Sequence, residues 1–380
     1  MAGNGGSARA GGATGGGGQS NAGGRTNAGG SLGGGGASGG AGGADETGGS
    51  SGGRSGDGGG GGADRNGGIS GGGGAQPIDA NKDSNTPADA RADAKDATPG
   101  DVASGGEVPQ GLFEACAPSR ADCLTNLDKM AAAGFKLVLN YSQEQGNAQQ
   151  ITAYLDHAKS LGMKVIWSFS DDVWYTGKVD LRKEYGQLAT TCNCTDNNGF
   201  ITYLVNLVKN HPALWGYYVA DEPPAAQERA VKTFSDLVHT IDPNHPRMIV
   251  ANADVSLITP FADDAENLGL DIYPFQDFPT SAACIQAVGS LAKEGQDLAT
   301  KHARTFSMTL QAMSWSQYPQ DFTPKYGSRY PTAAEFRGQR DQALKNGKPV
   351  LLLWFSYFDI QRSDNPAGHW ADLVSGAFGP

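Results

Sequence analysis

Large apolar side chains are almost absent from the first 110 of the 380 residues. This stretch holds 40 of the 57 glycines and hardly any Leu, Ile, Phe, Tyr or Trp. Such a composition cannot bury enough apolar surface to offset the entropy that a chain loses on folding. We therefore expect a disordered tail over residues 1–108 and one folded domain over residues 109–380. The tail is rich in Gly, Ser and Ala and then in Ala, Asp and Pro, which is typical of a tether.

The chain also lacks a basic patch and a long hydrophobic run. Lys and Arg number 29 against 40 Asp and Glu, and the formal net charge is −11. Nucleic acid and anionic membranes are therefore poor partners for this protein. No apolar run approaches the roughly 20 residues of a membrane span. No secretory signal is visible at Met1, and we expect a monomer.

Cysteine is scarce, with five residues, and no histidine lies close to either cysteine pair. The spacing fits no zinc site. Cys116 and Cys123 flank a short polar loop and are expected to form a disulfide, while Cys192 and Cys194 lie in a second loop. Cys284, on an expected helix, is the odd one. Because loop cysteines beside a tether suit an oxidising compartment, we expect an extracellular or cell-surface domain, with reduced thiols as the alternative.

After residue 110, apolar runs of strand length alternate with amphipathic helical stretches. The expected strands cover residues 111–115, 135–141, 164–169, 214–220, 247–251, 268–273, 305–312 and 349–355. The expected helices cover residues 120–133, 148–161, 200–210, 225–241, 281–302, 332–346 and 369–378. This alternation predicts an α/β fold with parallel strands, a (β/α)8 TIM barrel, for which about 250 residues is typical. A doubly wound sheet would need a glycine-rich phosphate turn after an early strand, and the sequence has none.

Histidine and cysteine are missing from the expected carboxyl ends of the strands, where barrel active sites lie. All six histidines fall on expected helices or on the loops at the opposite end of the barrel. A metal-dependent hydrolase and a Ser-His-Asp or Cys-His site therefore lack their ligands or their base. We expect no metal and no cofactor.

Carboxylates and aromatic residues crowd these strand ends instead. Such a set suits a sugar, because aromatic rings stack on pyranose faces and two carboxyls can cleave a glycosidic bond. The expected catalytic residues are Glu222, Asp271 and Asp221. The expected substrate-binding residues are Gln311, Tyr273, Trp167, Trp315, Trp354, Asn140, Asn252 and Asp171. Glu222 has the alternative role of a helix-start carboxylate, Asp171 and Asp172 that of loop caps, and the tryptophans that of core residues. Glu114 and Asp359 are weaker candidates.

The segment Leu-Trp-Gly-Tyr-Tyr-Val-Ala-Asp-Glu-Pro, residues 214–223, resembles the fourth-strand motif of clan-A-type (β/α)8 glycoside hydrolases. The segment Asp-Ile-Tyr-Pro, residues 271–274, and the strand that contains Trp354 are similar to sugar-site segments of the same superfamily. The resemblance implies that Glu222 is the acid/base. The chain departs from the family at Asp221, where the clan usually has Asn. It also departs at Gln311, where retaining members have a nucleophilic Glu that an amide cannot replace.

These observations favour a glycoside hydrolase that acts on a poly- or oligosaccharide through acid/base carboxylates. Because Gln311 offers no nucleophile, we expect inversion, with the Glu222 and Asp271 carboxyls roughly 6.5–9.5 Å apart to leave room for water. A substrate-assisted route is open as well. The alternative is a glycan-binding barrel without catalysis, which Gln311 also favours. A third hypothesis is a structural surface protein in which the tail is the functional part.

Overall fold

The computed structural model describes residues 107–169, 172–318 and 325–380. Eight parallel strands close into a barrel in chain order, with the first strand paired to the last. The strands are β1 Gln110–Glu114, β2 Leu137–Asn140, β3 Lys164–Ser168, β4 Leu214–Asp221, β5 Arg247–Asn252, β6 Asn267–Ile272, β7 Thr305–Gln311 and β8 Leu351–Phe355. The predicted (β/α)8 barrel is confirmed. The predicted tail lies almost wholly outside the described residues.

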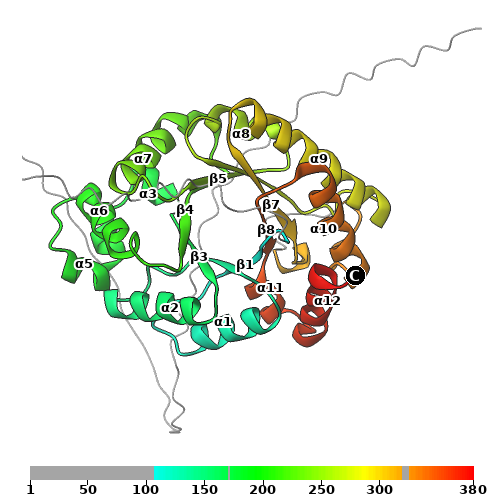
Figure 1. Ribbon diagram of the computed structural model, residues 1–380, viewed down its shortest axis with the longest axis horizontal. Coiled ribbons are helices and arrows are strands. Elements are labelled where there is room, and N and C mark those ends of the chain that lie inside the picture. Colours follow the sequence, from blue (N-terminus) through cyan, green and yellow to red (C-terminus); the bar gives the residue numbers. More distant parts are fainter. Residues whose placement is uncertain (1–106, 170–171, 319–324) are drawn as a thin grey trace, which may run out of the picture. The chain divides into compact units, whose positions relative to one another are not determined.

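The helices surround the strands on the outside of the barrel, as Figure 1 shows. They are α1 Asp122–Ala132, α2 Ala148–Ser160, α3 Asp172–Thr176, α4 Leu181–Glu184, α5 Gly186–Cys192, α6 Asn197–Val208, α7 Glu228–Ile241, α8 Val255–Ile258, α9 Ser281–Lys301, α10 Ala333–Gly347, α11 Tyr357–Arg362 and α12 Pro366–Phe378. The sequence predicts the long helices, and the structure adds the short α3, α4, α5, α8 and α11. Within the described ranges, no helix has both the length and the apolar character needed to cross a bilayer.

Each strand has two buried faces, because one lines the barrel interior and the other packs against helices. On β8, Leu351, Leu353 and Phe355 belong to the inner cluster of apolar side chains, whereas Leu352 and Trp354 belong to the outer one. Buried parallel strands are apolar on both faces for this reason. The alternation along each strand therefore decides which side chain at its carboxyl end points into the barrel.

Local sequence fixes where several helices begin and end. Asn147 caps α2 in a capping box with Gln150, and Thr332 caps α10 in the same way. Gly134 follows α1 with φ +107°, a conformation that favours glycine after a helix. Gly216 on β4 is needed for another reason. A Cβ there would lie 2.3 Å from the backbone carbonyl oxygen of Pro246, which directly precedes β5.

Two disulfides join the four loop cysteines. Cys116 pairs with Cys123, with Cα atoms 5.6 Å apart, and Cys192 pairs with Cys194, with Cα atoms 5.1 Å apart. Both Cα separations lie in the usual range for a disulfide. Cys284 is a free, buried thiol on α9. The predicted Cys116–Cys123 bond and the predicted odd cysteine are both confirmed.

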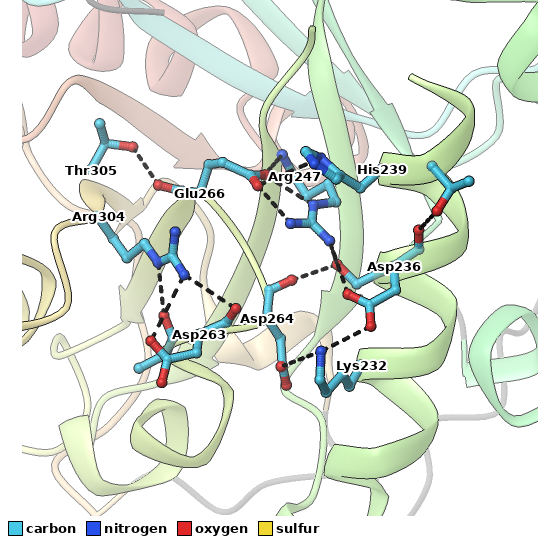
Figure 2. A network of polar contacts seen from close by, with 12 residues as sticks. Lys232, Asp236, His239, Arg247, Asp263, Asp264, Glu266, Arg304 and Thr305 are labelled. Atoms are coloured by element: carbon cyan, nitrogen blue, oxygen red, sulfur yellow. Dashed lines mark hydrogen bonds and ion pairs between the residues drawn. The ribbon is translucent and has the colours of Figure 1, made fainter. Parts of the chain in front are cut away.

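Charged residues form a network at the amino ends of β5, β6 and β7, the end of the barrel opposite the expected site (Figure 2). Arg247 begins β5 and donates to the Glu266 carboxylate at 2.9 and 2.5 Å and to the Ser235 hydroxyl at 3.0 Å. On α7, Lys232 pairs with Asp236 at 2.8 Å. Each labelled acid in this network lies near a cation or accepts a hydrogen bond from a backbone or side-chain donor. The network fixes the bottom of the barrel.

Candidate active site

The fourth strand supplies two consecutive carboxyl groups to the mouth of the barrel. The register of β4 shifts against both neighbours, so the strand is irregular before it ends at Asp221. Glu222 follows with φ +44°, in the left-handed region, and its N–H donates to the carbonyl of Val250 on β5 at 2.8 Å. A non-glycine residue held in this region points to a functional constraint. The chain thus turns sharply between the two acids.

The Asp221 carboxylate is held by two phenols. Tyr218, on the inner face of β4, donates to one oxygen at 2.7 Å. Tyr141, which follows β2, donates to the other at 3.1 Å. Burial and the charge of Asp221 raise the pKa of Tyr218 well above its ordinary value, so this phenol keeps its proton. These bonds fix the carboxylate of Asp221 at the rim.

Asp271, near the end of β6, is the most deeply placed acid of the site. Asp271 is 3% exposed, and the Tyr273 hydroxyl donates to its Oδ2 at 2.9 Å. Its Oδ1 has no donor among the described residues. The carboxyl lies within hydrogen-bonding reach of the Glu222 carboxyl. Two carboxyls in contact favour a state in which they share one proton.

Burial raises the pKa of the Asp271 carboxyl well above its ordinary value, and the charges of Glu222 and Asp221 raise it further. Asp221 and Glu222 therefore act on the same acid. Adjacent side chains diverge on an extended strand, but Glu222 leaves the extended conformation. The result is a cluster of three carboxyls in which burial and the neighbouring charges favour the protonated form of Asp271.

Aromatic rings form the wall of the mouth around these carboxyls. The ring of Phe355, from the end of β8, lies 5.3 Å from Phe113 and 5.4 Å from Tyr273. Tyr141 packs on Phe113 at 5.3 Å, and Trp315 packs on Tyr273 at 6.1 Å. Apolar rings beside oxygen acceptors suit a ligand with both apolar faces and hydroxyl groups.

Solved structures share this architecture, although no protein-family model and no curated protein matches the sequence. A β-galactosidase from the psychrophilic Marinomonas ef1 superposes with a TM-score of 0.50 at 9% identity, over 70% of this chain and 58% of that chain. An endo-β-1,4-mannanase from Thermotoga petrophila gives 0.46 at 11% identity, over 66% and 68%. A thermostable mutant of a xylanase from Cellvibrio japonicus gives 0.46 at 11% identity, over 71% and 98%.

The chain shares the barrel fold of the β-galactosidase. The predicted resemblance to clan-A-type barrels is confirmed at the level of the fold. Identities this low say nothing about individual side chains, so the role of each residue in this barrel depends on its own contacts.

Two of the three predicted tryptophans lie away from the mouth. Trp167 and Trp354 are 1% and 0% exposed and belong to the outer cluster, between strands and helices. Trp354 donates to the Gln110 amide at 2.9 Å. The prediction that they bind sugar is wrong in this structure, because alternation along β3 and β8 turns them outward. Phe355, which sequence analysis missed, takes the inward position on β8.

The predicted amide ligands hold loops rather than face the mouth. Gln311 is fully buried, accepts from the N–H of Phe275 at 2.9 Å and donates to the carbonyl of Met313 at 2.9 Å. Asn140 is also fully buried and bonds in both directions to the backbone of Cys116. Neither amide exposes an atom to a substrate in this conformation.

The two other predicted polar ligands are Asn252 and Asp171. Asn252 is exposed at the end of β5, beside Asp271 in the strand register, and accepts from the N–H of Ala253 at 2.7 Å. It remains a candidate ligand at the rim. Asp171 lies outside the described residues.

The expected spacing of the catalytic carboxyls is also wrong. Glu222 and Asp271 lie in direct contact, whereas the prediction places them roughly 6.5–9.5 Å apart with a water between them. The sharp turn at Glu222 brings its side chain towards β6, which strand order alone does not reveal. The geometric basis of the inversion prediction is therefore lost.

The weaker candidates have structural roles. Burial raises the pKa of Glu114 to about 7, and this carboxyl bonds to the N–H of Ala115 and to Asn126 in the outer layer. Asp359 accepts from the hydroxyls of Tyr318 and Ser356. The sulfurs of Cys116 and Cys123 lie near Asp122 in a cluster of metal-site dimensions, but their disulfide leaves no thiolate ligand.

Proposed function

We propose that this protein is a glycoside hydrolase in which Glu222 is the proton donor. The supporting observation is the contact between the Glu222 and Asp271 carboxyls in a mouth lined by aromatic rings. Cleavage of a glycosidic bond requires a proton donor, because the leaving oxygen must be protonated, and two carboxyls in contact favour a state that keeps one proton.

The three acids divide the work by position. Glu222 is partly exposed and donates its proton to the glycosidic oxygen as the bond to the anomeric carbon breaks. Asp271, buried behind it, shares the one proton of the pair between turnovers and passes that proton to Glu222 as the glycosidic oxygen takes it. The Asp221 carboxylate, fixed by Tyr141 and Tyr218, stabilises the positive charge that develops on the sugar ring. Water supplies hydroxide to the anomeric carbon and returns a proton to Glu222.

The test is a hydrolysis screen with the full chain on xylan, mannan, galactan and cellulose and on 4-nitrophenyl glycosides. Glu222→Gln should reduce kcat by roughly 10²–10⁴-fold on any substrate that the wild type cleaves. Asp264→Asn is the control, since Asp264 is a buried acid at the other end of the barrel. Equal turnover by wild type and Glu222→Gln would remove Glu222 from the mechanism.

A glycan-binding barrel without catalysis is the second candidate. It is favoured by β7, which ends in the buried amide Gln311 and offers no nucleophile there. This alternative predicts binding of a polysaccharide without release of reducing ends. Calorimetry beside a reducing-sugar assay on the same polysaccharide separates the two candidates.

We also propose that the barrel works in an oxidising compartment, extracellular or at the cell surface. Two disulfides in one domain support this location, because cytosolic thiols are kept reduced. Mass spectrometry of the protein isolated from its native cells should find both bonds. Free thiols at all four positions would contradict the location.

A further inference from the structure

A cavity of about 500 Å³ lies between the segment that leaves β6 and the loop that leads to α10. Phe278 and Tyr326 line it and are 38% and 48% exposed. In the part of the chain that the structure describes, Leu257 is the one other large apolar side chain with such exposure. Exposed aromatic rings gathered at one cavity indicate a binding surface, whereas single exposed residues need no explanation.

The chain segments that line this cavity also contribute residues to the candidate active site. Tyr273, which donates to the buried acid of the carboxyl pair, is two residues from Phe275 in the cavity lining. On the other loop, Ser328 lines the cavity and shares a hydrogen bond of 2.8 Å with Ser314. Ser314 precedes Trp315, which packs on Tyr273. The same two loops therefore border both the mouth and the cavity.

The charges of the cavity are already compensated by the protein. Arg329 donates to both oxygens of the Glu335 carboxylate, at 2.7 and 2.5 Å. Beside the cavity, burial raises the pKa of Asp277, and a hydrogen bond with Gln276 and the charge of Lys325 oppose this rise. An anionic ligand would have to compete with these carboxylates for the same cations. The cavity therefore favours a ligand without net charge.

The lining contains both aromatic rings and polar groups. Thr280, Ser281 and Ser328 place hydroxyl groups there, and the guanidinium of Arg329 lies over the Phe275 ring at 5.4 Å. Flat apolar rings beside hydroxyl groups match a molecule that has apolar faces and a rim of hydroxyl groups. Each of these hydroxyl groups already takes part in a hydrogen bond within the protein, and a hydroxyl, which has one donor and two acceptor positions, can bond to a ligand hydroxyl as well.

We propose that the cavity is an accessory sugar-binding position that holds a neutral glycosyl unit, with Phe278 and Tyr326 as stacking platforms. This inference rests on the proposed function, since it assigns the cavity to the same glycan that enters the mouth. The protein then gains affinity with the length of the glycan, because a longer chain occupies both places.

The experiment measures binding to the full chain that carries Glu222→Gln, so that bound glycans persist. Calorimetry is done with mannohexaose, xylohexaose and cellohexaose, each beside its disaccharide. Phe278→Ala and Tyr326→Ala should each weaken binding of the recognised hexasaccharide by about 2- to 10-fold, and the double variant by more. The disaccharide should lose less affinity. Leu257→Ala is the matched control, and thermal melting checks the fold of every variant.

Each outcome separates the two proposals. In one outcome, Phe278→Ala and Tyr326→Ala each bind the hexasaccharide as tightly as Leu257→Ala does, while hydrolysis on the wild-type background is normal. This result overturns the accessory sugar-binding position and leaves the proposed function in place. An equal loss for hexasaccharide and disaccharide also overturns it, because the cavity is then not a separate position. If the Glu222→Gln chain binds no glycan and the wild type cleaves none, the proposed function fails together with the cavity.

Discussion

The two ends of this barrel treat their charges in opposite ways. At the amino ends of the strands, Arg247 meets Glu266 and Lys232 meets Asp236 in ion pairs (Figure 2). At the carboxyl ends, Glu222 and Asp271 make no ion pair with a residue of the described ranges and lie against each other. Paired charges at the bottom stabilise the fold, whereas acids in mutual contact at the mouth destabilise it. Groups that lower stability in this way are typical of functional sites.

The largest expected effect is the loss of activity in Asp271→Asn. The amide cannot retain the proton that the carboxyl pair shares, so kcat should fall by roughly 10²–10⁴-fold. Stability at pH 7 should not fall, because a buried acid without a cation is replaced by a neutral group of the same shape. Kinetics on the substrate found in the screen, with urea unfolding, measure both quantities.

The pH dependence of the same variant distinguishes a positioning role from a purely structural one. The alkaline limb of the pH–rate profile should move to lower pH when the second acid is removed. Asp264→Asn should leave both kcat and the profile unchanged. A profile of Asp271→Asn that coincides with the wild type would contradict the shared proton.

The second largest effect is the loss of stability in Arg247→Met. The substitution leaves the half-buried Glu266 carboxylate without its guanidinium, and we expect a cost of about 3 kcal/mol in unfolding free energy. Activity should persist, so the outcome is the opposite of that for Asp271→Asn, which loses activity and keeps its stability. Denaturant unfolding measures the cost, and Arg247→Met with Glu266→Gln should recover part of it. A single variant that is as stable as wild type would show that the ion pair contributes nothing.

The sign of the pH dependence follows from Glu266. Burial alone would raise the pKa of this carboxyl, but hydrogen bonds from Arg247 hold it below its ordinary value. Its contribution to stability is therefore present above an ordinary glutamate pKa of about 4.3 and is lost as the pH falls through the lowered value. The cost of Arg247→Met should shrink over the same acidic range.

Sequence patterns predict the order of strands and helices along the chain well, because apolar runs and helix caps are local signals. They predict Glu222, Asp271 and Asp221 at the mouth for the same reason, since each follows or ends a strand. They do not reveal which face of a strand points inward, because both faces of these strands are apolar. Trp354 and Phe355 are neighbours of equal hydrophobic character, and only the barrel shows which one lines the mouth.

The contact between the acids depends on a feature that no local pattern contains. The register shifts of β4 and the left-handed conformation of Glu222 are set by packing against β3 and β5. Gln311 is similar, because its amide is satisfied by the loop after β6, which is remote in sequence. Sequence reasoning therefore finds the candidate residues, but it does not predict the distances between them.

A smaller effect concerns what fixes each end of the barrel. The Cys116–Cys123 disulfide lies just after β1 at the mouth and closes a ring with a sequence separation of 7. Replacing both cysteines by Ser should lower the unfolding free energy by about 2–3 kcal/mol. This loss should not change with salt, whereas the loss in Arg247→Met should decrease as salt screens the pair. Urea unfolding at low and high NaCl tests the contrast, and an identical salt response in both variants would contradict it.

The smallest effect comes from Asp264, the one acid of the bottom network that resembles Asp271. It is 3% exposed, Lys232 lies 4.0 Å from its Oδ1, and its Oδ2 has no donor among the described residues. Burial raises its pKa to about 6, although the charge of Lys232 lowers it. The folded state therefore binds this proton more tightly than the unfolded state, and ionisation makes folding less favourable as the pH rises through about 6.

Asp264→Asn removes that penalty, so the variant should gain on the order of 1 kcal/mol over wild type at pH 8 and less at pH 4.5. Urea unfolding at these two values and at pH 6 measures the gain. Asp263→Asn is the control. The side chain of Asp263, the preceding residue, is 76% exposed, so this substitution should change stability by less than about 0.5 kcal/mol. A gain for Asp264→Asn that is equal at pH 4.5 and pH 8 would show that ionisation of Asp264 is not its source. The gain would then have to come from packing, and the likeness between the two buried acids at opposite ends of the barrel would no longer hold.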